Sequence, residues 1–317
     1  QAVAWMQSDD AFYNAGFEIE RKTVGERSLF HSGAGLHCVR ALVSAAQSDA
    51  GTANRAMRAF IEHSMGANDA VDRAFGLDAV IGKGSLLLGC AELIESVPDL
   101  PAFERAVVRA RGEELARDIL GALEPAAIED SDLRTLGIAH GWAGLLFVLL
   151  RWARATGASA AATVRARLDE LAMLAEPDGA GMRWPVTHGG SSFMDGWCNG
   201  SAGHAMLFAL ASEALGESRY GELAERAAAS ACSGAITIGT LCCGQAGIGY
   251  AAMAVHRITG SAQWLERARV CARVAAADRS PHLLRDALYK GAVGVALFAE
   301  ELSAPEATAM PLFEPRR

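Results

Sequence analysis

The chain has 317 residues with a formal net charge of −8, and hydrophobic residues make up 51% of it. The acidic balance argues against a nucleic-acid partner, because binding a polyanion normally needs a clustered basic surface. No apolar run reaches the length of a membrane span, and the first residues lack the charged and apolar regions of a signal peptide, so we expect a soluble, cytoplasmic protein.

A short glycine segment recurs six times along the chain, and an apolar run follows each copy. The segments share two small residues three positions apart, and the first of these is Ser32, Gly82, Gly141, Gly200, Gly244 and Gly291. Successive first positions lie 50, 59, 59, 44 and 47 residues apart. Each interval has room for two helices and their connections.

The stretches between the glycine segments are of two kinds. Residues 103–111 and 264–270 carry charges on one side only and are predicted to form outer, amphipathic helices. Residues 145–150 and 206–210 are apolar on nearly every side, which predicts helices buried all round. Residues 176–196 hold too many glycines and prolines for a helix and are predicted to form a loop beside the site.

Alternating buried and amphipathic helices predict an all-α fold. We expect an α/α toroid, a double-layered barrel of inner and outer helices with the Gly-x-x-Gly turns at one mouth. The glycines are expected to supply positive φ and close backbone approach where helix starts crowd together. An open α-solenoid is the structural alternative, although its repeats are usually shorter and more uniform. The segments at Ser32 and Gly291 carry no matched set of ligands or bases and are interpreted as packing.

Three cysteines stand in equivalent glycine segments. Cys198 lies two residues before Gly200, Cys242 lies two before Gly244, and Cys243 follows directly. Repeat geometry therefore brings their thiols together, and three thiolates can hold Zn²⁺ with one position open for chemistry. Buried packing residues and a strained vicinal disulfide are the alternatives.

The remaining cysteines fit a reducing compartment, because the total of seven is odd and no secretory signal precedes them. Cys38, Cys90 and Cys271 lie inside apolar helical patterns and are assigned to packing. His204, on the helix after Cys198, is assigned to the core or the surface, with a contact behind the metal ligands as the alternative.

These motifs together resemble the LanC-like lanthionine cyclases: Trp-Cys-Asn-Gly at Cys198, Cys-Cys-Gly at Cys242, and His-Gly-x-x-Gly at His140. The resemblance covers essentially the whole chain. It implies an α/α toroid, a zinc ion at its mouth, and addition of peptide cysteine thiols to dehydroalanine or dehydrobutyrine, which makes (methyl)lanthionine thioether rings in a ribosomal peptide. It also implies one cyclase domain over residues 1–317, free-standing or within a longer multidomain synthetase. The substrate is then a dehydrated precursor peptide, and a dehydratase or a kinase/lyase enzyme is the partner.

The family's functional residues carry over position by position. Cys198 and Cys242 match the two cysteine ligands, and Cys243 falls where most members have histidine, although some members have Cys-Cys-Gly. His140 matches the active-site histidine and Asp78 the aspartate. An imidazole can take the thiol proton or protonate the enolate near neutral pH. The simpler alternatives are a backbone-bonded residue at a helix start for His140 and an N-cap for Asp78.

The cysteine at position 243 changes the charge of the implied site. Two thiolates and a neutral histidine offset the charge of Zn²⁺, whereas three thiolates leave the site net negative by one. A substrate thiolate is then held less tightly and stays more nucleophilic. This predicts a fast, more reversible and less selective cyclase.

Two family positions do not carry over. Met194 stands where other members have an arginine, and Asn199 stands where some have a tyrosine. Asp195, His188 and Arg183 in the preceding loop are candidate replacements, with solvated loop residues or turn formers as the simpler interpretation.

Three other functions are alternatives. Intermolecular addition of glutathione or another small thiol at the same zinc would raise the product mass by that of the thiol. A non-catalytic peptide-binding scaffold with structural zinc predicts a fourth protein ligand, and predicts that Cys198→Ala unfolds the chain. A glycosidase needs two carboxylates at the mouth, and only Asp78 and Asp195 lie near the turns.

Overall fold

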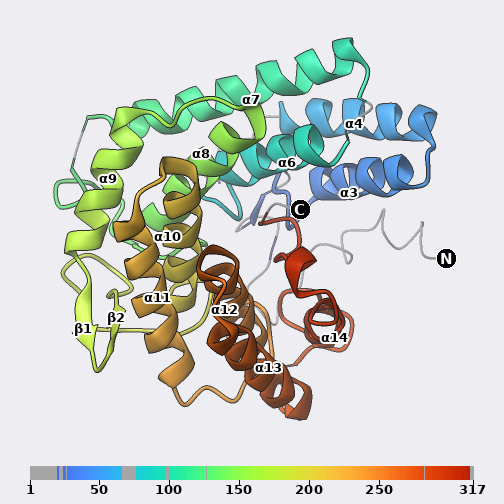
Figure 1. Cartoon of the computed structure of the whole chain (residues 1–317). Helices are drawn as coiled ribbons and strands as arrows, with labels where there is room; N and C mark the ends of the chain where they lie inside the picture. The colour runs from blue at the N-terminus through green and yellow to red at the C-terminus, as the bar shows by residue number, and fades with distance from the viewer. Residues whose placement is uncertain are drawn as a thin grey trace. The chain divides into compact units, whose positions relative to one another are not determined.

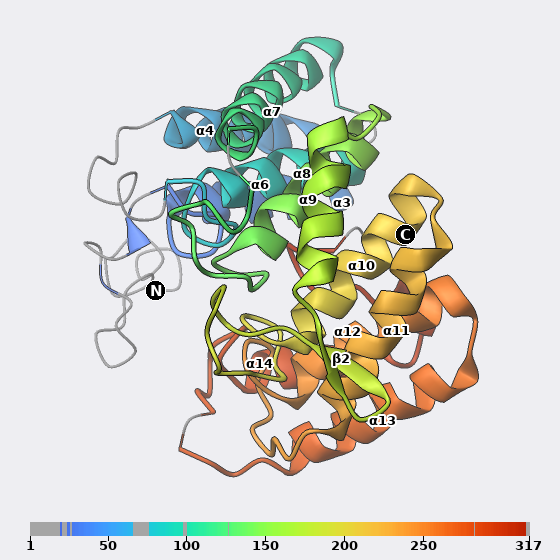
Figure 2. The same cartoon turned by 90° about the vertical axis from the view of Figure 1, so that its left-hand side faces the viewer.

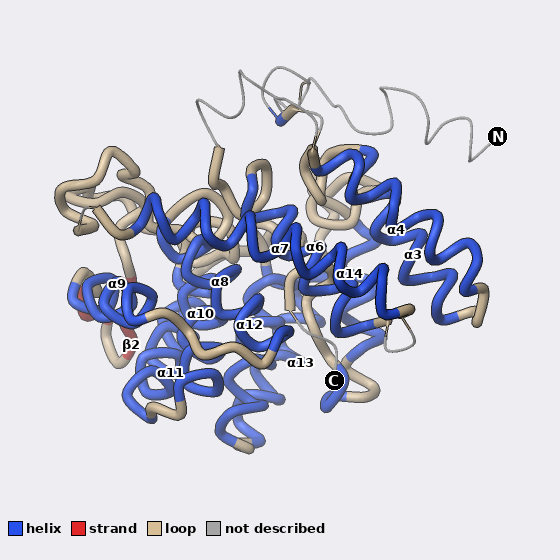
Figure 3. The backbone as a smooth tube through the Cα atoms, turned by 90° about the horizontal axis from the view of Figure 1, so that it is seen from above, coloured by secondary structure: helices blue, strands red, loops and turns tan. Residues whose placement is uncertain are grey.

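In the computed structural model, the residues described are 20, 24–25, 27–65, 76–97, 100–125, 127–281 and 283–314. Helices dominate this part of the chain, and the strands described form one short hairpin (Figure 3). The all-α class expected from the sequence is therefore confirmed. None of the helices described combines the length and the apolar character that a membrane span requires.

The helices follow one another along the chain in the order shown in Figure 1. They are α3 (Gly33–Ala46), α4 (Ala50–Ser64), α6 (Lys83–Ser96), α7 (Ala102–Leu123), α8 (Trp142–Thr156), α9 (Ala162–Met173), α10 (Ser201–Leu215), α11 (Ser218–Ser233), α12 (Gln245–Thr259), α13 (Ala262–Ala277) and α14 (Ala292–Glu301). The chain divides into two compact units. Unit 1 contains residues 1–123 and 151–159, and unit 2 contains residues 124–150 and 160–317.

Four of the helices that follow the glycine segments, α6, α8, α10 and α12, are buried on nearly every side, as predicted, whereas α3 and α14 bury one side only. Every residue of α6 from Gly84 to Ile94 is buried, and so is every residue of α10 from Ser201 to Ala211. In α12 the buried stretch runs from Gln245 to Val255. Because side chains on all faces are withdrawn from water, these helices are held by packing rather than by an amphipathic stripe.

The outer helices bury one side only, which is also as predicted. In α13 the buried residues are Trp264, Ala268, Cys271 and Ala275, spaced at helical intervals along one face. Within each unit an inner helix packs on the helix that follows it, namely α6 on α7, α10 on α11 and α12 on α13.

The glycines at the helix starts serve close approach, and the expectation of positive φ there is wrong. Gly200 and Gly244, the N-caps of α10 and α12, have φ values of −125° and −124°. A β-carbon on Gly244 would lie 2.2 Å from the carbonyl oxygen of Ile238, so a side chain does not fit. Positive φ occurs instead at the C-caps of the same two helices, at Gly216 (68°) and Gly260 (67°).

The long segment before Cys198 is non-helical, as predicted, and it contains a hairpin that was not foreseen. β1 (Glu176–Asp178) pairs antiparallel with β2 (Gly181–Arg183), and β2 packs against α11 (Figure 2). Three-residue strands are too short for an alternating pattern to be visible in the sequence. A further antiparallel bridge joins Pro185 to Phe193 and folds the rest of the loop back on itself.

Candidate metal centre

Backbone hydrogen bonds join four of the glycine-segment loops in series within unit 2. The bonded residue in each loop is the one two positions before the first glycine. The Ala139 N–H donates to the Cys198 carbonyl (2.9 Å), the Cys198 N–H to the Cys242 carbonyl (3.0 Å), and the Cys242 N–H to the Tyr289 carbonyl (2.9 Å). This backbone series sets equivalent positions of successive repeats side by side.

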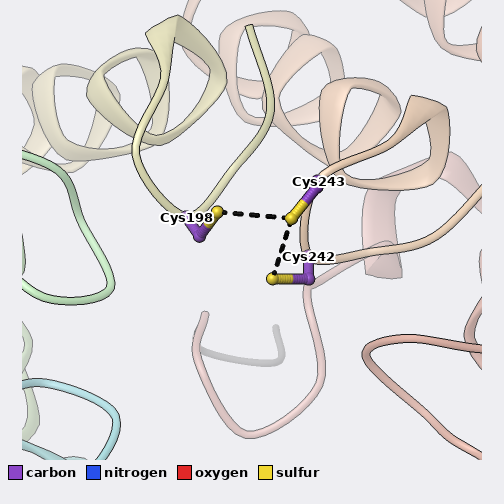
Figure 4. Close-up of side chains that lie close together, drawn as sticks. All are labelled: Cys198, Cys242 and Cys243. Atoms are coloured by element: carbon purple, nitrogen blue, oxygen red, sulfur yellow. Dashed lines mark hydrogen bonds between the residues drawn. The ribbon is translucent and has the colours of Figure 1, made fainter. Parts of the chain in front are cut away.

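The series brings the three predicted ligands together. The Sγ of Cys243 lies 3.5 Å from that of Cys198 and 3.3 Å from that of Cys242, and all three sulfurs lie within 4.8 Å of one another. Figure 4 shows the sulfur atoms pointing toward one another from the loops ahead of α10 and α12. Tetrahedral zinc with Zn–S bonds of about 2.3 Å separates its sulfur ligands by about 3.8 Å, so the thiols fit that ion.

The cluster concentrates negative charge on one sulfur. The pKa of Cys243 is lowered to about 3, because the thiols of Cys198 and Cys242 hydrogen-bond to it and the charges of Lys290 and His140 add to the effect. The same thiol–thiol hydrogen bonds, together with burial, raise the pKa of Cys242. All seven cysteines are free thiols, so Cys242 and Cys243 do not form the vicinal disulfide considered above.

Helix starts support the thiolate form of the cluster. Cys243 directly precedes Gly244, the N-cap of α12, and Cys198 lies two residues before Gly200, the N-cap of α10. The positive end of a helix dipole favours an adjacent anion and lowers the pKa of a nearby thiol.

His140 lies in the same unit and acts on the cluster electrostatically. It stands one residue before Gly141, the position that Cys243 holds before Gly244. Its carbonyl accepts a hydrogen bond from the Thr135 hydroxyl (2.6 Å), which fixes the loop, and its charge helps lower the pKa of Cys243. Its acid–base role stays a prediction.

Asp78 lies in unit 1 and closes its own loop. Its Oδ1 accepts hydrogen bonds from the N–H groups of Val80 (2.7 Å) and Ile81 (2.8 Å). The N-cap of α6 is Gly82, so Asp78 is a turn former rather than the N-cap considered from the sequence. Its role in acid–base chemistry likewise stays a prediction.

Lys290 is a functional candidate that the sequence interpretation missed. It stands one residue before Gly291, in a segment that was assigned to packing alone. Its positive charge adds to the lowered pKa of Cys243, which the thiol hydrogen bonds mainly cause, and it opposes the raised pKa of Cys198. Its position, equivalent to His140 and Cys243 in the aligned segments, was the available signal.

The candidate replacements for the family arginine are engaged within their own loop. Met194 is 39% exposed. The Arg183 guanidinium lies 3.9 Å from the ring centroid of Phe193 and 3.8 Å from the Asp178 carboxylate. Burial raises the pKa of Asp195, and the charge of Asp178 adds to that shift.

His204 is a core residue behind the Cys198 loop. Its Nδ1 lies 3.0 Å from the carbonyl oxygen of Gly200, and its ring stacks on that of Trp184 at 4.5 Å between centroids. Complete burial lowers its pKa to about 4. His188 is tied through its backbone instead, since its N–H donates to the Arg134 carbonyl (2.7 Å).

The chain thus combines buried and amphipathic helices, glycine turns and a three-thiol centre in one helical fold. The sequence model of the family described as Lanthionine synthetase C-like protein matches residues 10–314. A solved structure named Nisin cyclase is similar in fold, with a TM-score of 0.68 and 15% sequence identity over 88% of this chain and 77% of that chain.

The chain therefore belongs to the lanthionine synthetase C-like family. Its fold class is the α/α toroid, as predicted. Membership supports a function of the lanthionine-cyclase type.

Proposed function

We propose that this protein is a zinc-dependent cyclase that adds the cysteine thiols of a dehydrated precursor peptide to dehydroalanine or dehydrobutyrine, forming (methyl)lanthionine thioether rings. The observation that carries the proposal is the convergence of three thiols in a chain of this family. The family match spans both compact units, which supports treating residues 1–317 as one cyclase domain. The peptide would come from an enzyme that dehydrates serine and threonine, a dehydratase or a kinase/lyase.

Cys198, Cys242 and Cys243 would hold the zinc ion. When bound, Zn²⁺ supplies the Lewis acidity that keeps a substrate thiol ionised near neutral pH. In the described part of the chain the cluster gathers three potential ligands rather than four, which supports a position left open for substrate over a closed structural site.

The ring closes by addition of S–H across the C=C bond of the dehydrated residue. The sulfur forms a bond to the β-carbon, and the electrons of the double bond move toward the α-carbon and its carbonyl. His140 takes the proton of the attacking thiol and returns it at the α-carbon, so atoms and electrons balance. We assign Asp78 as the second acid–base candidate, held rigidly by its turn.

Metal analysis and a cyclisation assay test the proposal together. Wild type is compared with Cys198→Ala, Cys242→Ala and Cys243→Ala, and with Cys232→Ala, a partly exposed cysteine on α11, as the matched control. We expect one zinc per chain in wild type and in the control, and loss of zinc in the other three with helicity retained in circular dichroism.

The assay uses a peptide with one dehydroalanine and one cysteine. Ring closure leaves the mass unchanged and removes the thiol from alkylation, and we expect this in wild type and the control only. Cluster variants that keep zinc and close rings at the wild-type rate would refute the proposal. A product heavier by one glutathione would identify intermolecular thiol addition instead.

A further inference from the structure

Four successive loops of unit 2 present one side chain each from the position directly before the first glycine. These residues are His140, Asn199, Cys243 and Lys290. The loop of Lys290 is bonded directly to the cysteine loop, because the Cys242 N–H donates to the carbonyl of Tyr289, the neighbour of Lys290 (2.9 Å). Lys290 thus occupies the repeat position beside a metal ligand.

The loop that carries Lys290 is fixed on both sides. The Leu284 N–H donates to the Lys290 carbonyl (3.0 Å), and Leu284 forms a β-bridge with Gly291. The Tyr289 hydroxyl donates to the Pro311 carbonyl (2.7 Å), which anchors the preceding side chain. The Lys290 side chain therefore starts from a backbone position that is held by hydrogen bonds, and this side chain is half-buried.

The main chain places Lys290 one residue from the hydrogen bond between Cys242 and Tyr289, in the repeat position that Cys243 holds in its own loop. Its charge adds to the lowered pKa of Cys243, after the larger effect of the hydrogen bonds from Cys198 and Cys242, and opposes the raised pKa of Cys198. Coulomb attraction between two charges is several times stronger near a partly buried site than in bulk water.

The number of thiolates determines how much negative charge the Lys290 ammonium can offset. Zn²⁺ with three thiolates has a net charge of −1, and a substrate thiolate as fourth ligand would bring it to −2. One fixed ammonium returns these values to 0 and −1, which are the values of a centre with two thiolates and a neutral histidine.

We propose that Lys290 is a positioning residue whose ammonium balances the third thiolate, so that the centre accepts a substrate thiolate as its fourth ligand. The inference rests on the proposed function. It also modifies the expectation from the sequence. A cysteine in place of histidine at position 243 lowers the affinity of the centre for the substrate thiolate, and Lys290 restores part of that affinity.

Cobalt-loaded protein tests the inference without turnover. The thiolate-to-cobalt absorption band is titrated with 2-mercaptoethanol at fixed pH in wild type, Lys290→Met, Lys290→Arg, Cys243→His and the double variant Cys243→His/Lys290→Met. Loss of the charge in Lys290→Met is expected to weaken thiol binding roughly tenfold, and Lys290→Arg is expected to stay within about twofold of wild type. In the Cys243→His background the same Lys290→Met change should weaken binding by a comparable factor from a tighter starting value, because the ammonium attracts the incoming thiolate whichever ligand stands at position 243.

The outcomes separate this inference from the proposed function. Wild type that binds cobalt and closes rings, beside a Lys290→Met protein that holds 2-mercaptoethanol as tightly, would overturn the role of Lys290 alone. Lys290→Arg that binds the thiol as weakly as Lys290→Met would do the same. Wild type that binds no metal at the cysteines would overturn both. Lys290→Gln provides a second neutral variant where Lys290→Met fails to fold.

Discussion

Cys243 is the residue that sets the net charge of the proposed zinc site. Its thiolate is stabilised by hydrogen bonds from Cys198 and Cys242 and by the positive charge of Lys290. Replacing it with histidine gives a centre with one less negative charge, which should hold the substrate thiolate more tightly and make it a weaker nucleophile. We expect Cys243→His to bind zinc and to slow single-turnover ring closure roughly fivefold, a barrier increase of about 1 kcal/mol. An unchanged rate would contradict the charge argument.

His204 makes stability depend on pH. Burial lowers its pKa to about 4, whereas an unfolded histidine titrates near 6.5. Between these values the unfolded chain binds a proton that the folded chain does not, so the free energy of unfolding falls as pH drops from about 6.5 to about 4 and is then level. The full effect is roughly 3 kcal/mol.

Urea unfolding at pH 7.5 and pH 4.5 measures this effect. His204→Gln is expected to lose less stability between the two pH values than wild type, even though it is less stable at pH 7.5. Equal losses in the two proteins would show that His204 does not titrate as described.

The three cysteines could be predicted from the sequence because they share an offset from a repeated glycine. Lys290 was missed because a lysine in a loop is ordinarily solvated, and its equivalence to Cys243 in the aligned segments was the one signal available; the backbone bond between Cys242 and Tyr289 is visible only in the structure. Asp78 was matched to a family position, but the sequence does not reveal that its carboxylate bonds its own turn.

At the scale of elements, the glycines of the helix starts differ from those of the helix ends. A β-carbon on Gly247 would lie 2.0 Å from the Leu241 carbonyl oxygen, directly before Cys242. The C-cap Gly216 has a φ of 68°, and a β-carbon added there would have nothing within 4 Å. Gly247→Ala should therefore destabilise by about 3 kcal/mol through overpacking and weaken zinc binding. Gly216→Ala should lower stability by about 1 kcal/mol and leave zinc affinity unchanged, as measured by chelator competition.

A buried ion pair joins α8 to α6 within unit 1. The Arg151 guanidinium donates to the carboxylates of Glu92 (3.0 Å) and Glu95 (2.5 Å), and the Arg151 and Glu92 side chains are 1% and 5% exposed. Arg151→Met leaves a carboxylate buried without its partner and should reduce the free energy of unfolding by about 3–5 kcal/mol. The exposed pair of Arg109 with Glu113 provides the control, since its removal should change stability by less than about 1 kcal/mol.

The buried helices themselves were predictable because their apolar runs are continuous. The ion pair was not, because its members are 59 residues apart and nothing in either apolar helix identifies the other as its partner. The β1–β2 hairpin was not predicted for a different reason. Its strands are three residues long, and they pack on α11 rather than showing a pattern of their own in the sequence.

At the scale of the molecule, the C-terminal segment completes the core of unit 2. The Phe313 ring is fully buried, stacks on Phe147 of α8 at 4.3 Å and meets Trp197 edge-on at 5.0 Å. Phe313→Ala should destabilise the protein by about 3–5 kcal/mol and, because Trp197 precedes Cys198, lower zinc affinity as well. Calorimetry and zinc titration measure the two effects. A variant with unchanged melting would show that the segment is dispensable.

The whole fold was the most predictable level. A solved structure of 15% identity shares it, so the alternation of buried and amphipathic helices with crowded glycine turns specifies the architecture more than any particular side chain does. The division into two compact units left no mark in composition and could not be predicted.

The main-chain bonds from Ala139 through Cys198 and Cys242 to Tyr289 use no side-chain atom. This hydrogen-bonded backbone is therefore compatible with different side chains at the same positions. Donor atoms at these positions can be exchanged one at a time for imidazole, thioether or carboxylate while the spacing of the backbone is conserved. A single scaffold could then be re-equipped for cations of different hardness without redesign of its helices.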